Sequence, residues 1–112
     1  MIYADTRLII VCPFDPGLPK IKLRPRGQYF TSDGEDIMFE CKASGYPKPD
    51  VKWLLPRTKK ELEASISSWP GYGRVQMKAT AVVDGKYTCQ ASNTEGVSQE
   101  ALFVTGMSLI YP

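Results

Sequence analysis

The sequence predicts an all-β fold, an antiparallel β-sandwich of about seven to eight strands in one domain. Three observations predict it. Short runs alternate apolar and polar residues, as half-buried strands do. Glycine and proline, nine of each among 112 residues, recur between these runs and mark turns. No segment with a helical period interrupts the series.

Three strands are predicted in the first half of the domain. Residues 20–24 alternate polar and apolar side chains, and a turn signal follows at Asp33-Gly34. Residues 36–43 form the next strand, whose apolar face consists of Ile37, Phe39, Cys41 and Ala43. The segment 44–49 is expected to be a turn, because its two prolines block a helix. The third strand follows at residues 51–53.

The second half begins with an ambiguous segment. Residues 58–65 fit a short helix, but Leu62, Ala64 and Ile66 alternate, which favours a strand or extended edge. Residues 69–73 are expected to form a loop, and residues 92–96 a tight turn. Further strands are predicted around three sets: Val75, Met77 and Ala79; Tyr87, Cys89 and Ala91; and Val97, Ala101 and Phe103.

The N-terminal residues 1–18 have a different character. Residues 7–12 are apolar and β-prone, but the prolines that follow cannot continue a ladder. The segment is either a linker that carries the end of a neighbouring module or an extra strand on a sheet edge. We therefore expect a domain at residues 19–106, with a C-terminal linker at 107–112.

The composition excludes most enzyme classes. Histidine is absent, so Ser–His and Cys–His nucleophiles and histidine zinc sites are excluded. Three cysteines are too few for an all-cysteine zinc site, and no phosphate-binding glycine loop is present. A net charge of +2 does not favour nucleic acid, and the longest apolar run, residues 8–12, cannot cross a membrane. We expect no catalytic residues, no cofactor and no metal.

Four residues carry a family resemblance. Cys41, Trp53, Tyr87 and Cys89 stand in an order and spacing that resembles the immunoglobulin fold. Two further segments resemble its I-set branch. They are Gly45-Tyr46-Pro47-Lys48-Pro49 ahead of the tryptophan, and Cys89-Gln90-Ala91-Ser92-Asn93-Thr94-Glu95-Gly96, which follows the pattern C-x-A-x-N-x-x-G.

The resemblance implies specific contacts. A Cys41–Cys89 disulfide would join the two sheets, Trp53 would pack on it, and the Tyr87 hydroxyl would bond to nearby backbone in a tyrosine corner. One departure concerns Asp84 and Gly85, because the family usually has a residue between them. The corner is therefore expected to be contracted, which puts an ion pair from Asp84 to Arg74 in doubt.

The resemblance also implies a function. It suggests a non-catalytic protein-recognition module, excised from a larger adhesion, receptor or extracellular-matrix protein, at the cell surface or outside the cell. Its partners would be proteins, including a second copy of the domain. The alternative is a structural spacer of a giant intracellular muscle protein, cytoplasmic and sarcomeric, in which the cysteines stay reduced.

Two candidate binding surfaces stand out. Trp69 and Tyr72 lie in the predicted loop, and large aromatics dominate protein-binding hot spots. Basic clusters could bind a sulfated glycosaminoglycan, although on an edge strand such residues also discourage aggregation. The candidate anion-binding residues are Lys20, Lys22, Arg24, Arg26, Arg57, Lys59 and Lys60.

Two other features are weaker candidates. Cys12 is an odd thiol, which either bonds to a neighbouring module or stays unpaired. The carboxylates near residues 33–36 do not match the spacing of a calcium loop, so a solvated turn is expected there.

Overall fold

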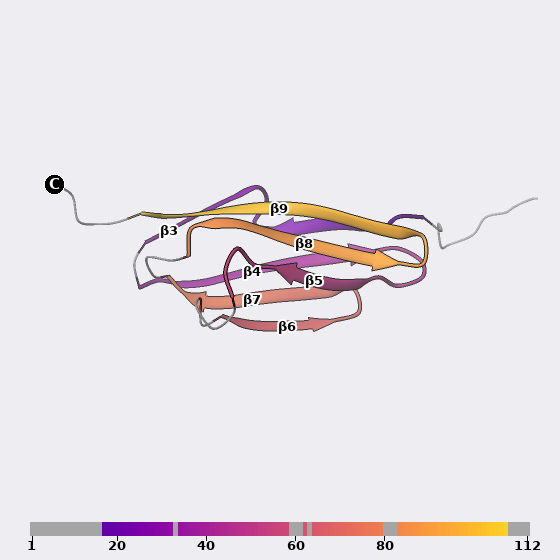
Figure 1. Ribbon diagram of the computed structural model, residues 1–112, viewed down its shortest axis with the longest axis horizontal. Coiled ribbons are helices and arrows are strands. Elements are labelled where there is room, and N and C mark those ends of the chain that lie inside the picture. Colours follow the sequence, from indigo (N-terminus) through magenta and orange to yellow (C-terminus); the bar gives the residue numbers. More distant parts are fainter. Residues whose placement is uncertain (1–16, 33, 59–61, 63, 80–82, 108–112) are drawn as a thin grey trace, which may run out of the picture.

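Two four-stranded β-sheets pack face to face in the computed structural model, which describes residues 17–32, 34–58, 62, 64–79 and 83–107 (Figure 1). One sheet has the order β2-β4-β7-β6, which are Lys20–Arg24, Asp36–Ser44, Tyr72–Lys78 and Ser65–Trp69. The other has the order β3-β9-β8-β5, which are Gln28–Ser32, Gly96–Met107, Gly85–Asn93 and Asp50–Leu54. The predicted all-β sandwich is confirmed. Within the described residues, no helix is long and apolar enough to span a bilayer.

One pair of strands departs from the antiparallel expectation. β3 runs parallel to β9, with Tyr29 opposite Val104, while the other strand pairs of both sheets are antiparallel. Figure 1 shows β3 and β9 side by side, both running toward the C-terminal end. Pro25 follows directly after β2 and has no N–H with which to extend its ladder. The chain then crosses to the other sheet, where the Gly27 carbonyl accepts a 2.8 Å bond from the Phe103 N–H.

The core lies between the sheets and is centred on Phe39. This side chain of β4 is fully buried. Its ring meets the rings of Trp53, Tyr87 and Tyr29 edge to face, at centroid distances of 5.0, 5.2 and 6.2 Å. Aromatic pairs favour this geometry because the positive ring edge meets the negative face. Strands from both sheets therefore converge on one aromatic cluster.

The crossing from β5 to β6 differs from the predicted strand. The Leu62 N–H donates a 3.1 Å bond to the Thr58 carbonyl, four residues earlier, which is a helical bond. Leu62 and Ala64 are buried, and β6 begins only at Ser65. Because β5 and β6 belong to different sheets, the chain has to turn across the sandwich here. Leu62 is buried at this crossing and makes a helical bond, so the strand favoured at this residue was wrong.

The residues predicted for the last strand, Val97, Ala101 and Phe103, all lie on β9, but its buried side chains are others. Leu102 and Val104 are buried, whereas Phe103 is 48% exposed and Val97 is 51% exposed. Successive side chains of a strand point to opposite faces, so apolar residues at consecutive positions cannot all be buried. β9 also continues to Met107, one residue beyond the predicted domain end. The predictions for residues 1–16, with Cys12, fall outside the described residues.

Candidate functional site

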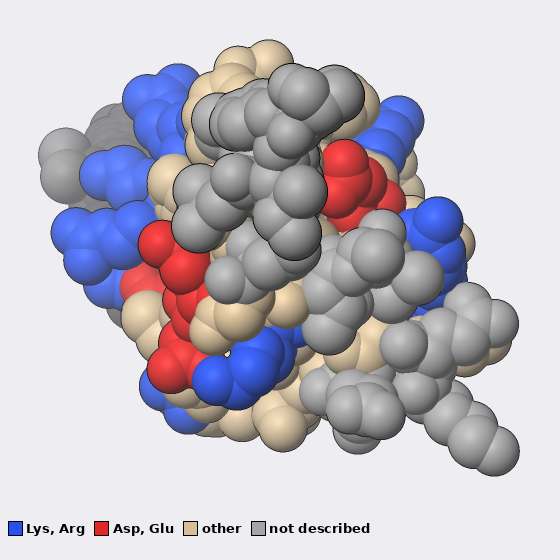
Figure 2. Space-filling view, turned by 90° about the vertical axis from the view of Figure 1, so that its left-hand side faces the viewer, with Lys and Arg blue, Asp and Glu red and all other residues tan. Residues whose placement is uncertain are grey.

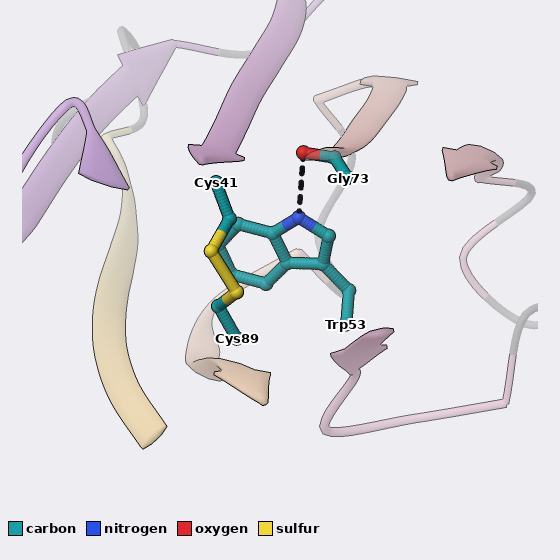
Figure 3. Close-up of a disulfide and its surroundings, with 4 residues drawn as sticks. All are labelled: Cys41, Trp53, Gly73 and Cys89. Atoms are coloured by element: carbon teal, nitrogen blue, oxygen red, sulfur yellow. Dashed lines mark hydrogen bonds between the residues drawn. A yellow bond between two sulfur atoms is a disulfide. The ribbon is translucent and has the colours of Figure 1, made fainter. Parts of the chain in front are cut away.

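Two links join the sheets at the centre of the domain. Cys41 of β4 and Cys89 of β8 form a disulfide, with their Cα atoms 6.4 Å apart. The indole of Trp53 lies beside it, and its Nε1–H donates a 3.1 Å bond to the Gly73 carbonyl of β7 (Figure 3). Burial of the indole thus leaves its polar N–H satisfied.

Gly73 was not predicted, and it allows this contact. A Cβ atom at Gly73 would lie 2.8 Å from Val51 Cγ1 and 3.2 Å from Trp53 Cδ1. Both distances are shorter than ordinary van der Waals contact, so a larger residue would push the indole away from β7. The two residues are 20 positions apart, and no local pattern in the sequence signals their contact.

The tyrosine corner is present in its expected place. The buried Tyr87 hydroxyl donates a 2.6 Å bond to the Val83 carbonyl. The Asp84 carboxylate accepts a 2.9 Å bond from the Gly106 N–H, and the Asp84 carbonyl accepts one from Arg57 at 3.1 Å. Asp84 therefore holds the end of β9 to the start of β8, which opens at Gly85.

Tyr87 makes stability sensitive to alkaline pH. Burial raises the pKa of Tyr87 from 10.0 to about 12. The unfolded chain therefore loses this proton first, and the stabilisation is complete below about pH 10 and is lost toward about pH 12. Across this pH window we expect the free energy of unfolding of wild type to fall by roughly 2–3 kcal/mol more than that of Tyr87→Phe. Urea unfolding at each pH measures both proteins. An equal alkaline loss in both proteins would contradict this role of Tyr87.

The predicted loop 69–73 is instead a β-hairpin. Trp69 ends β6 and lies opposite Tyr72 at the start of β7. Only Pro70 and Gly71 lie between them, and Gly71 has a φ of +82°, the conformation that a proline–glycine type II turn requires. The Gly71 N–H donates to the Pro49 carbonyl, and the Gly71 carbonyl accepts from the Ala43 N–H, both at 2.9 Å. The turn is thus held against neighbouring backbone.

The hairpin presents a stacked aromatic pair. The rings of Trp69 and Tyr72 are 4.6 Å apart and inclined by 24°. The Tyr72 hydroxyl donates a 2.8 Å bond to Glu40 of β4. Burial, and then this hydrogen bond, raise the pKa of Tyr72 above its usual value. Trp69 is 53% exposed, so its ring rests on an anchored partner while its other face meets solvent.

The seven candidate anion-binding residues do not form one surface. Lys20, Lys22 and Arg24 alternate along β2 and are exposed. Arg57 lies near Asp84 at the start of β8, whereas Lys20 lies opposite Ser44, at the end of the molecule where β8 finishes. Figure 2 shows the end of the domain where β4 and β8 begin, with acidic and basic side chains interspersed. Lys59 and Lys60 fall outside the described residues.

The carboxylates near the first turn bind neighbouring groups of the domain itself. Glu35 accepts bonds from the Ser32 N–H at 2.9 Å and the Thr31 hydroxyl at 3.0 Å, which lower the pKa of Glu35. Asp36 pairs with Lys78 at 3.1 Å. Among the described residues, no three metal-ligating side chains gather at one place.

Comparisons with known proteins agree with this geometry. The immunoglobulin domain family matches residues 19–93. The muscle M-line assembly protein unc-89 of Caenorhabditis elegans is 39% identical over 67% of this chain, and rat neural cell adhesion molecule L1 is 32% identical over 64%. The chain spans 1% and 6% of those relatives, respectively.

A solved structure shows the same fold. The titin tandem immunoglobulin domains A164–A165 superpose with a TM-score of 0.68 at 20% identity, over 85% of this chain and 52% of theirs. Immunoglobulin domains are typically non-catalytic. The relatives include both adhesion molecules and giant muscle proteins. With a two-sheet sandwich, a central tryptophan and a family match over most of its length, the chain belongs to the immunoglobulin domain family and is I-set-like.

Proposed function

We propose that this domain is a non-catalytic protein-recognition module of an extracellular or cell-surface protein. The observation that carries the proposal is the aromatic hairpin, in which an exposed Trp69 stacks on an anchored Tyr72. A rigid, half-exposed tryptophan loses little conformational freedom when a partner covers it, which is typical of hot spots. Residues 19–106 would be the recognition domain, with the flanking residues linking it to neighbouring modules.

The disulfide supports a location outside the cell. Disulfides persist in oxidising compartments and are rare in the cytosol. Similarity to the adhesion molecule L1 supports the same location. The alternative, an intracellular spacer domain, is supported by similarity to unc-89 and to titin. Mapping the disulfide by mass spectrometry, on native protein with thiols trapped at lysis, decides between them. A Cys41–Cys89 bond supports the proposal, and free thiols at both positions support the spacer.

We expect Trp69→Ala to weaken partner binding without unfolding the domain. Loss of a hot-spot tryptophan costs at least about 2 kcal/mol, or roughly thirtyfold in affinity. The domain is assembled into tetramers, and their binding is measured to two targets. One is beads coated with a second copy of the domain, and the other is intact cells of the source tissue. Melting temperatures are recorded alongside.

Phe103→Ala is the matched control, because this ring is 48% exposed on the outer face of the other sheet. Equal losses for Trp69→Ala and Phe103→Ala, or no loss for either, would contradict the hairpin as the recognition surface. A lower melting temperature for Trp69→Ala would assign Trp69 a structural role instead.

A further inference from the structure

Four lysines line one groove on the outer face of the β2-β4-β7-β6 sheet. The groove has a volume of about 530 Å³ and is lined by Lys20 and Lys22 of β2, Lys42 of β4 and Lys48 of the following turn, with Tyr72 among its other residues. An adjoining hollow of about 350 Å³ shares Lys22 and Lys42 and also includes Arg24, Arg26 and the carboxylate of Glu40. The two hollows therefore follow β2 from end to end.

The centre of this groove is a repulsive pair. Lys22 lies directly opposite Lys42 in the ladder. Like charges at opposed positions destabilise a sheet. The ion pair between Lys78 and Asp36 lies on other residues. The domain thus maintains an unfavourable arrangement at the groove, as functional sites often do.

Protection of a sheet edge does not explain Lys42. Lysines are expected on β2, because β2 is an edge strand and charged side chains there discourage pairing with another chain. β4 is a central strand, paired on both sides. The nearby carboxylate of Glu40 accepts the Tyr72 hydroxyl and lies opposite Arg24 and Arg74 in the two ladders. Glu40 also lines the adjoining hollow with Lys22 and Lys42, where the cationic side chains outnumber this one carboxylate.

The arrangement suits a linear polyanion. Alternate residues of a strand are spaced by about 7 Å, so Lys20, Lys22 and Arg24 form a regular row of positive charge. Lysine presents a compact charge with three rotatable donors, which tolerates sulfates in varied orientations. The side chain of Lys48 lies beside the hairpin, because its Cδ atom would be 3.2 Å from a Cβ atom placed at Gly71.

Tyr72 adds an aromatic wall to the groove. Its ring belongs to the hairpin and lines the groove together with the lysines, and its hydroxyl donates a hydrogen bond to Glu40. An aromatic ring offers an apolar surface on which the CH face of a sugar can pack. From the row of cations, the opposed lysine pair and the aromatic wall, we infer that the groove binds a sulfated polysaccharide. This inference goes beyond protein recognition and does not depend on it.

The test compares two double variants with equal charge loss. Lys22→Gln/Lys42→Gln alters the groove, and Lys52→Gln/Lys86→Gln alters exposed lysines on the outer face of the other sheet. The probe is a heparin-derived hexasaccharide, titrated by calorimetry at about 50 and 150 mM salt. We expect the groove variant to lose at least about tenfold in affinity and the control less than about twofold. Equal losses in both variants would overturn the assignment to this groove.

Two further measurements keep the result interpretable. The melting temperature of the groove variant should equal or exceed that of wild type at low salt, because a repulsive pair has been removed. A lower value would show that the lysines support the fold, and would overturn the inference. Polyglutamate and phosphatidylserine vesicles are offered as competing anions. If either binds as tightly as the hexasaccharide, the groove is not a sugar site and the inference fails.

Discussion

Replacing Cys41 and Cys89 together by alanine is expected to lower the free energy of unfolding by about 4 kcal/mol. The bond closes a loop with a sequence separation of 48 residues. Closing that loop removes many conformations from the unfolded chain, which accounts for the stabilisation in the chain-entropy model. Urea unfolding of the oxidised wild type and of the double variant measures the difference.

Unfolding in the presence of a reductant, which breaks the disulfide of wild type, is the control for this prediction. The reductant should destabilise wild type by about the same amount and leave the double variant unchanged. A loss below about 1 kcal/mol would contradict the expected contribution of the bond. It would also support the spacer hypothesis, because a domain that works in the reducing cytosol has to remain folded without the bond.

Phe39→Ala is expected to cost about 4 kcal/mol, a loss as large as that of the disulfide. The side chain is fully buried and meets three aromatic rings within 6.2 Å. Truncation removes the transfer free energy of the ring and leaves a cavity whose rigid neighbours cannot collapse into it. Chemical unfolding measures the loss.

Surface phenylalanine again provides the comparison. Phe103→Ala should change the free energy of unfolding by less than about 0.5 kcal/mol, because its ring lies on the solvent face of β9. A cost below about 2 kcal/mol for Phe39→Ala would show that the aromatic cluster is not the centre of the core.

The alternation of apolar and polar residues predicted which side chains are buried where one face of a strand is polar. Along β4 the apolar positions Ile37, Phe39 and Cys41 are the buried ones, so pattern and burial agree. Along β9 apolar side chains occur on both faces, and hydrophobicity alone does not decide which face is buried. A short helix at residues 58–65 was set aside because Leu62, Ala64 and Ile66 alternate, but only Ile66 belongs to β6, and Leu62 makes a helical bond.

The residues that share a candidate surface could not be predicted without knowing how the strands pair. Lys42 stands between Cys41 and Ala43 and looks like any outward polar residue of a strand. Only the register that places it opposite Lys22 makes it part of a groove. Conversely, Arg57 was included among the candidate anion-binding residues because it is basic. The fold places it beside Asp84, at the other end of the molecule from Lys20.

The parallel pairing of β3 with β9 has a consequence for synthesis on the ribosome. Gln28 emerges early in translation, but its partner Phe103 is among the last residues of the domain. Contacts so distant in sequence form slowly, and unpaired strand edges invite aggregation. A nascent chain must therefore hold β3 unpaired until nearly the whole domain has left the exit tunnel. We therefore expect the edge that β3 pairs with to stay open to chaperones until β9 is complete.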